Sequence, residues 1–169
     1  WSMGGASRWW LHHALESLNT SLHGKLQLYR GEPLAILSKL ARDTSAQNVY
    51  WNRCYEPWRI ARDGEIKTAL KAADIEVQSF NGSLLWEPWQ VLKKDQTPYK
   101  VFTPYYRRGC LSKVSPRKPL AAPNSVRSLN LSEDSLKLED LELKPIIKWD
   151  TEMQARWDIS EEAAQDRLD

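Results

Sequence analysis

The chain has 169 residues, enough for one globular domain with a substantial core and too few for two domains of ordinary size. Its 24 Lys and Arg residues nearly balance its 22 Asp and Glu residues, and the net charge of +2 gives no overall attraction to a polyanion or an anionic membrane. No apolar run approaches the roughly 18 residues of a membrane span, and the two cysteines lack metal-ligand spacing, so we expect a cytoplasmic protein without a membrane partner.

Helical and extended patterns alternate through the first half of the chain. Over 6–22, apolar side chains recur at the spacing of one helix face, and Gly24 ends this predicted helix. Pro57 suits the first turn of a later helix, whose apolar face includes Ile66 and Leu70. The other predicted elements of this half are a strand over 25–29, a helix over 34–41, a strand over 48–51 and a strand over 75–80.

This alternation predicts an α/β fold, in which a Rossmann-like parallel sheet carries helices on both faces. Ligands bind such sheets outside the carboxyl ends of the strands, so the loop at 52–56 is the first place to look for a site. The loop combines polar and aromatic side chains, as a pocket for a planar ligand does. A structural turn, with Glu56 near the amino terminus of the next helix, would give the same pattern.

The second half of the chain is less periodic. Thr103 and Pro104 predict the cap and the first turn of a short helix, and three prolines within 116–123 then indicate a linker. Asp158 and Glu161 form the pattern of a capping box that opens a last helix. We therefore divide the chain into an α/β domain over 1–123 and a region over 124–169 that holds the linker and a short helix.

A basic cluster lies near the end of the first region, with five positive and no negative side chains over 107–118. Such a cluster can follow the phosphates of DNA, with Arg107, Arg108 and Lys113 as the contacts. A solvated basic loop would have the same composition. No metal site is predicted, because His12 and His13 are adjacent on a helix and point to different sides.

Four segments, in chain order, resemble the amino-terminal part of the DNA photolyase and cryptochrome family. They are Gly5–His13, Val49–Pro57, Arg62–Asp63 and Tyr99–Tyr105. Residues 157–168 are similar to the segment that leads into the helical flavin domain of this family. Members begin with further strands that fill the middle of the sheet, so the resemblance implies a partial domain whose first strands are missing.

The resemblance implies that the chain is the antenna-chromophore-binding part of a light-driven DNA repair enzyme, a deoxyribodipyrimidine photolyase. In relatives the antenna is a folate, a deazaflavin or FMN, and it passes excitation energy to FAD in a larger carboxy-terminal domain. We expect FAD, the catalytic residues and the contact with damaged DNA only in the full-length parent, and we assign no catalytic residue to this chain. The positions that match the antenna site are Asn52, Arg53, Glu56, Trp58 and Arg59.

Two other functions fit the same residues. A cryptochrome-type blue-light photoreceptor would share this domain and differ in the flavin domain. A truncated α/β interaction module without photochemistry would use its exposed strand edges for self-association, because unpaired edges favour pairing with another chain. Trp58 and Arg59 also stand where one bacterial type of folate-binding relative carries an Asn-Glu pair, which argues against the same folate pose.

Overall fold

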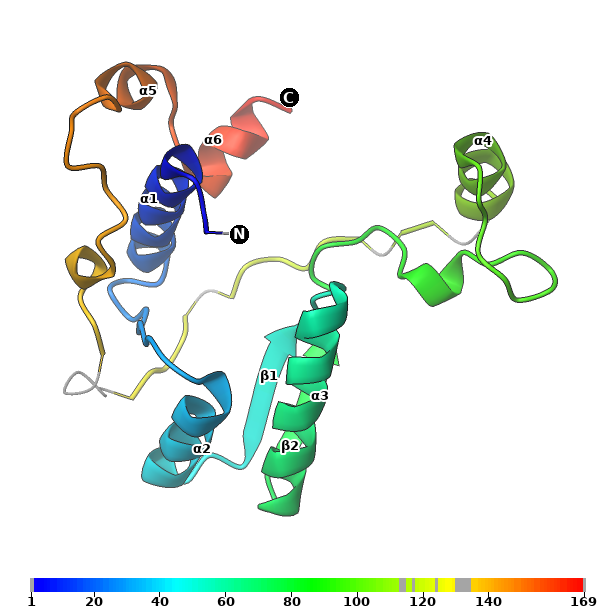
Figure 1. Ribbon diagram of the computed structural model, residues 1–169, viewed down its shortest axis with the longest axis horizontal. Coiled ribbons are helices and arrows are strands. Elements are labelled where there is room, and N and C mark those ends of the chain that lie inside the picture. The colour runs from blue at the N-terminus through cyan, green and yellow to red at the C-terminus, as the bar shows by residue number, and fades with distance from the viewer. Residues whose placement is uncertain (1, 113–114, 117, 124, 130–134, 169) are drawn as a thin grey trace. The chain divides into compact units, whose positions relative to one another are not determined.

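The computed structural model of the protein shows two compact units (Figure 1). One unit consists of Trp1–Arg30 together with Pro123–Asp169, and the other of Gly31–Ala122. The structure describes residues 2–112, 115–116, 118–123, 125–129 and 135–168. None of the helices in these ranges combines the length and the apolar character needed to cross a bilayer.

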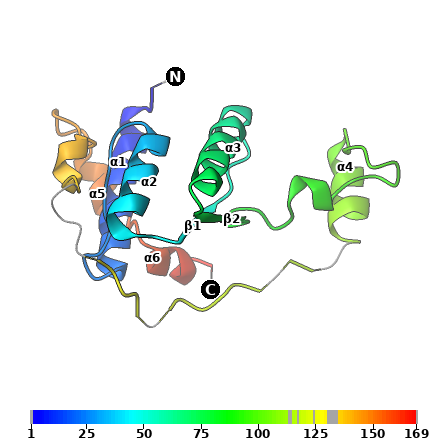
Figure 2. The same cartoon turned by 90° about the horizontal axis from the view of Figure 1, so that it is seen from below.

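The 31–122 unit is built on two parallel strands, β1 (Asn48–Asn52) and β2 (Glu76–Phe80), with Val49 opposite Val77. The crossover between them is α3 (Pro57–Ala72), and Figure 2 shows this helix standing on the strands. A further helix, α2 (Pro33–Thr44), precedes β1. Both helices have a proline in their first turn, where a backbone N–H has no partner to lose. The predicted α/β class and parallel pairing are therefore confirmed.

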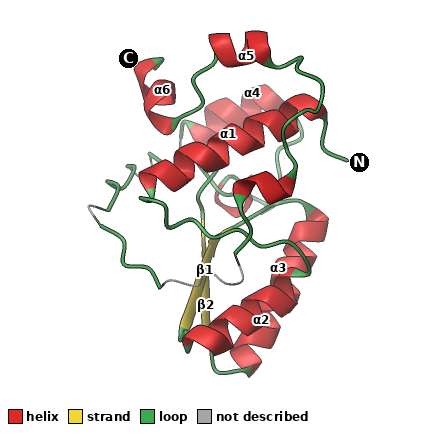
Figure 3. Cartoon of the chain, turned by 90° about the vertical axis from the view of Figure 1, so that its left-hand side faces the viewer, coloured by secondary structure: helices red, strands yellow, loops and turns green. Residues whose placement is uncertain are grey.

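The core of this unit lies on one face of the two strands. Ile66 and Leu70 of α3 pack against Val77 of β2, and all three side chains are at most 4% exposed. Leu34 and Leu37 of α2 pack against the same cluster. Figure 3 shows α2 and α3 next to each other beside the strands. Burying each of these aliphatic side chains contributes about 1.5–3 kcal/mol to folding.

The opposite face of the strands is open. Tyr50 and Phe80 lie on it with ring centroids 6.0 Å apart, and they are 57% and 48% exposed. Among the described residues of this unit, α2 and α3 both cover the same face of the strands. The prediction had placed helices on both faces. Alternation along each strand explains this pattern, because successive side chains point to opposite faces.

The strand predicted over 25–29 is wrong. Of these residues only Leu28 pairs, in an isolated antiparallel bridge with Leu136. Side chains accept from two backbone N–H groups of this segment: Asn19 Oδ1 accepts from Leu26 at 3.1 Å, and Ser135 Oγ accepts from Leu28 at 3.1 Å. An alternating polar and apolar pattern can therefore occur in an extended segment that has no neighbouring strand.

Beyond β2 the unit continues through η1 (Pro88–Gln90), α4 (Phe102–Pro104) and a wider helical turn, η2 (Tyr105–Cys110). The helix predicted near Thr103 is present, but its cap is Val101, which makes no capping hydrogen bond through its side chain. Gly109 of η2 packs so closely on Val91 that an added Cβ would lie 2.6 Å from Val91 Cγ1. This contact holds η2 against the segment that follows η1.

The other unit contains α1 (Gly5–Ser21), η3 (Leu138–Leu141), α5 (Thr151–Arg156) and α6 (Glu161–Asp166). The predicted first helix is confirmed, and Trp9 and His12 are its buried residues. The predicted capping box at Asp158 is wrong, because Ser160 caps α6 by accepting from the backbone N–H of Ala163 at 3.0 Å. Serine and aspartate are similarly good caps, and the extended backbone at Ser160 places its hydroxyl within reach of the free N–H groups of the first turn.

Candidate functional site

The loop after β1 lies at the edge of the sheet where both parallel strands end. Asn52 and Phe80 are the last residues of β1 and β2, and they are partners in register. The backbone N–H of Arg53 continues the ladder by donating to Phe80 O at 2.8 Å. Because α3 starts at Pro57, the loop is held between the ladder and the first helical turn. The structure therefore brings the five predicted antenna contacts to one end of the strands.

Arg53 is held by an ion pair with Glu87, which is 7% exposed. Arg53 Nε donates to Glu87 Oε1 at 2.7 Å, and the Tyr55 hydroxyl donates to the same oxygen at 2.8 Å. Arg53 Nη1 also donates to Ser79 Oγ at 3.2 Å and to the Ser79 carbonyl. The side chain thus ties the loop to β2 and to η1.

The contact with Glu87 favours the charged form of Arg53. The hydrogen bond to Glu87 raises the pKa of the Arg53 guanidinium, and burial followed by the bond to Glu87 raises the pKa of the Tyr55 phenol. Arg53 therefore acts first as a support for the loop. Glu87 was not predicted as a site residue. It directly follows the apolar residues Leu84, Leu85 and Trp86, and a carboxylate in such a position indicates that it has a partner.

Trp58 and Arg59 form the outer part of the site. Trp58 is 62% exposed, and the guanidinium groups of Arg59 and Arg62 lie 5.1 and 5.4 Å from its ring centroid. Arg59 donates to Cys54 Sγ at 3.3 Å and lies 3.7 Å from Glu56 Oε1, and the bond to the thiol is the main cause that raises its pKa. An exposed indole between two cations suits a planar ligand that carries negative charge.

A depression of about 450 Å³ opens beside these residues, lined by Arg53, Cys54, Tyr55, Glu56, Arg59 and Ser83. Arg59 Nε is buried and lacks a hydrogen-bond partner among the described residues. The side chain of Asn52 lies directly under Gly82, where any Cβ would collide with its amide. Arg62 pairs with Asp63 at 2.6 Å on the surface of α3.

The predicted DNA contacts fall partly on η2. Arg107 and Arg108 are exposed residues of that turn, whereas Lys113 lies outside the described residues. Arg108 lines a depression of about 580 Å³, which Lys94 and Trp89 line as well. The described residues contain no group of three His, Cys, Asp or Glu side chains that could hold a metal ion.

Comparison with known proteins identifies the family. The family model described as DNA photolyase matches residues 1–124. The chain belongs to the DNA photolyase family. A deoxyribodipyrimidine photo-lyase of Agrobacterium fabrum is 36% identical over 171 residues, and cryptochrome-1 of Arabidopsis thaliana is 34% identical over 144 residues. A crystal structure of a bacterial class III photolyase from Agrobacterium tumefaciens matches 98% of the chain with a TM-score of 0.89 and 36% identity.

These matches confirm the resemblance and assign the chain to the amino-terminal α/β domain of the photolyase family. The photo-lyase match covers 99% of this chain and the cryptochrome match 81%. The chain spans only 36% of that photo-lyase, 21% of that cryptochrome and 35% of the crystallised photolyase. Members of this family bind chromophore cofactors.

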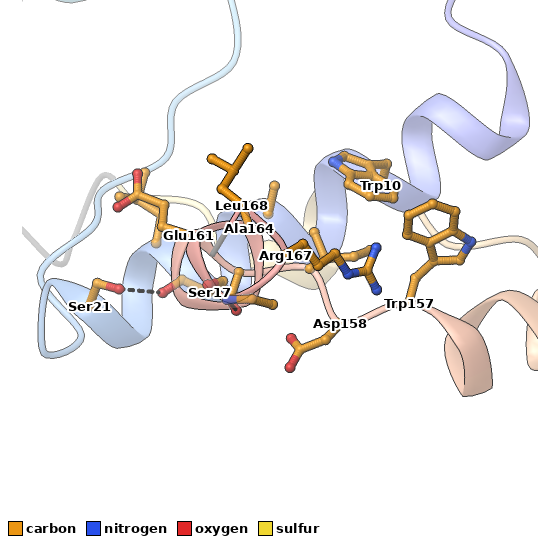
Figure 4. A pocket seen from close by; sticks show the side chains of 14 residues that line it. Trp10, Ser17, Ser21, Trp157, Asp158, Glu161, Ala164, Arg167 and Leu168 are labelled. Atoms are coloured by element: carbon orange, nitrogen blue, oxygen red, sulfur yellow. Dashed lines mark hydrogen bonds between the residues drawn. The ribbon is translucent and has the colours of Figure 1, made fainter.

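The photolyase-family chain has a third depression, within the unit that contains α1, which the sequence analysis missed (Figure 4). It has a volume of about 620 Å³ and lies between α1 and the segment that includes α6. Trp10 and Trp157 line it with ring centroids 5.6 Å apart, and Arg167 lies 4.9 Å from the Trp157 centroid. The sequence does place Trp10, Ala14 and Leu18 on one face of a helix, and it has a tryptophan at position 157. Nothing in the sequence shows that this face and Trp157 are in contact.

Proposed function

We propose that the chain is the antenna-chromophore-binding domain of a light-driven, cytoplasmic DNA repair enzyme that acts on pyrimidine dimers. The observation that carries this proposal is the site at the carboxyl ends of β1 and β2, in a chain whose photo-lyase match covers 99% of its length. The chromophore, when bound, would absorb light and transfer excitation to FAD held by the longer parent. A cryptochrome-type photoreceptor is the second candidate, because cryptochrome-1 matches 81% of the chain.

Within this site, Trp58 would stack on the chromophore and Arg59 would bind a polar or anionic group through its free Nε. Arg53 would hold the loop in place through Glu87, and Glu56 would keep Arg59 oriented. Asn52 closes the site from the strand side, next to Gly82. These five residues fit a folate, a deazaflavin or FMN, each a planar ligand with a polar arm.

The first prediction concerns Trp58. Replacing Trp58 by Leu in the full-length parent should remove antenna absorbance and leave dimer repair under direct flavin excitation intact, because the exposed indole would contact the antenna and not the flavin. Absorption spectra and repair assays at antenna and flavin wavelengths measure the two effects. Trp149→Leu is a matched control, since Trp149 is a 44% exposed indole of the other unit and does not line the depression at Arg59. Equal loss of both activities would assign Trp58 a folding role.

A contribution to DNA binding is proposed for Arg107, Arg108 and Lys113. The supporting observation is that Arg108 and Lys94 line one depression, which the exposed indole of Trp89 lines as well, and neither cation forms an ion pair among the described residues. Cations beside an aromatic ring are the usual features of a nucleic-acid surface.

The second prediction tests this surface. The double change Arg107→Glu and Arg108→Glu in the full-length parent should weaken binding to damaged DNA and lower the slope of log K against log salt by about 1–2. Lys67→Glu with Lys71→Glu on α3 changes the same charge away from this surface and should leave the slope nearer that of the parent. An unchanged slope in the arginine variant would exclude phosphate contacts at these positions.

A further inference from the structure

The indole of Trp89 connects two depressions of the unit that contains the sheet. One depression lies beside the loop after β1 and is lined by Arg53 and Tyr55 among others. The other, which we call the basic depression, has a volume of about 580 Å³ and is lined by Trp89 together with Lys94 and Arg108. Because Trp89 packs against both Arg53 and Tyr55, side chains in direct contact form walls of the two depressions.

Trp89 is attached to the loop through two side chains whose own positions are fixed. The guanidinium carbon of Arg53 lies 5.6 Å from the centroid of the Trp89 ring, and the Tyr55 ring centroid lies 6.2 Å from it. Both partners donate to one carboxylate oxygen of the buried Glu87, Arg53 Nε at 2.7 Å and the Tyr55 hydroxyl at 2.8 Å. A cation held over an indole attracts the ring electrostatically, so a change in the freedom of Trp89 also affects Arg53.

The rest of the Trp89 surface is open and lies beside positive charge. The residue is 56% exposed, although two side chains pack on it. Among the described residues, Lys93 pairs with Asp95 at 3.3 Å, whereas neither Lys94 nor Arg108 forms an ion pair. Cations beside an open aromatic ring suit a DNA strand, whose phosphates pair with the cations and whose bases stack on the ring. A strand bound in the basic depression therefore contacts the open surface of Trp89.

We propose that Trp89 couples the two depressions, so that a DNA strand in the basic depression orders the loop after β1. A base that packs on Trp89 restricts the motion of its ring, and Arg53 and Tyr55 lose freedom with it. A ligand of the loop then needs less further ordering, which makes the two binding events mutually favourable. The inference rests on the DNA contact proposed above for Arg108, and it holds for any ligand of the loop.

Cys54 reports the state of the loop without any antenna ligand. It lines the depression beside the loop and is half-buried, whereas Cys110, the other cysteine, is 3% exposed. The rate at which Cys54 reacts with the uncharged thiol reagent dithiodipyridine therefore measures how often the loop opens. We expect a saturating short oligothymidine to slow this reaction about threefold to tenfold, a coupling at the lower end of the range for linked sites. Cys54→Ser gives the background rate.

A first pair of variants identifies where the oligonucleotide binds. The double change Lys94→Gln and Arg108→Gln removes two phosphate contacts, so the protection of Cys54 should require more oligonucleotide and still reach the parent level at saturation. Fluorescence anisotropy of a labelled oligothymidine measures the occupancy in each protein. Lys67→Gln with Lys71→Gln on α3 is the matched control, because it removes the same charge away from the basic depression and should leave the midpoint nearer that of the parent.

A second set of variants breaks the coupling. Trp89→Leu removes the ring that contacts Arg53, so Cys54 should stay fully reactive even when anisotropy shows that the oligonucleotide is bound. Glu87→Gln removes the ionic contact that fixes Arg53 and keeps the basic depression, so it should reduce the protection as well. Trp149→Leu is the control, since Trp149 is an indole of the other unit, 44% exposed, and should keep the parent protection. Circular dichroism of each variant shows whether the fold is retained.

Three results would overturn the proposal. Protection of Cys54 that persists in fully occupied Trp89→Leu protein would mean that the oligonucleotide covers the thiol directly. Bound oligonucleotide that leaves the reactivity of Cys54 in the parent unchanged would mean that the two depressions are independent, and the proposed DNA contact would stand. No binding of the oligonucleotide would remove that contact together with the coupling. Anisotropy separates the last two results, so failure of the coupling and failure of the proposed DNA contact are distinguishable.

Discussion

His12 is a titratable side chain that α1 holds in the protein interior, 3% exposed. Burial is the main cause that lowers its pKa from 6.5, and the charges of Lys144 and His13 act in the same direction. His12 therefore stays neutral in the folded chain at a pH where the unfolded chain already binds a proton. Its contribution to stability is present above the unfolded pKa and is lost as the pH falls through the window below about 6.5.

The third prediction follows from this sign. The urea midpoint of the chain should fall between about pH 7.5 and pH 5.5, and His12→Leu should flatten this dependence because Leu keeps the volume and does not titrate. The measurement is a set of urea denaturation curves across that pH range. His23→Leu serves as control, since His23 lies at the exposed end of α1 and shows no comparable burial. Equal slopes in the parent and in His12→Leu would contradict this role for His12.

Individual residues of the loop after β1 show what the sequence could and could not predict about the site. Arg53, Trp58 and Arg59 were predicted as site residues because they follow a predicted strand and lie in, or directly after, a segment that resembles the family. Their roles could not be found, because the partner of Arg53 is Glu87, which is 34 residues further along the chain. A side chain that supports a loop and one that contacts a ligand look alike in sequence when both are polar residues at a strand end.

At the scale of elements, the helices and strands with strong periodicity were predicted and the weak ones were not. β1, β2, α2 and α3 lie where their apolar spacing and Pro57 indicated. The segment at 25–29 failed because strand pairing requires a neighbour that local pattern cannot supply. The predicted cap of α6 was wrong by two residues, since Ser160 and Asp158 are both good caps and only backbone geometry decides between them.

The fourth prediction concerns the contact between η2 and the segment after η1. Gly109→Ala should destabilise the 31–122 unit by about 1–3 kcal/mol, because the new Cβ would meet Val91, which is 3% exposed. Val91→Ala removes the methyl groups that collide, so the double variant should recover part of this loss. Urea unfolding of the parent, the two single variants and the double variant gives the coupling free energy. Strictly additive effects would mean that this close approach is not what requires glycine.

At the scale of the whole molecule, the small sheet decides how the chain behaves in solution. Among the described residues β1 and β2 pair only with each other, so each has an outer edge with unpaired backbone groups. The face that carries Tyr50 and Phe80 is exposed as well. An open edge beside an exposed aromatic face favours pairing with a second chain.

The fifth prediction is that the chain self-associates through β1 and β2. Sedimentation velocity should show a mass that rises with protein concentration, and Tyr50→Lys should shift the chain toward monomer because a charge beside a strand edge opposes strand addition. Tyr106→Lys introduces the same charge at another exposed tyrosine, 45% exposed and away from the sheet, and should leave the association unchanged. A monomer at every concentration would exclude the interaction-module function. Association that both lysine variants weaken equally would instead reflect general charge repulsion, and the strands would have no special part in it.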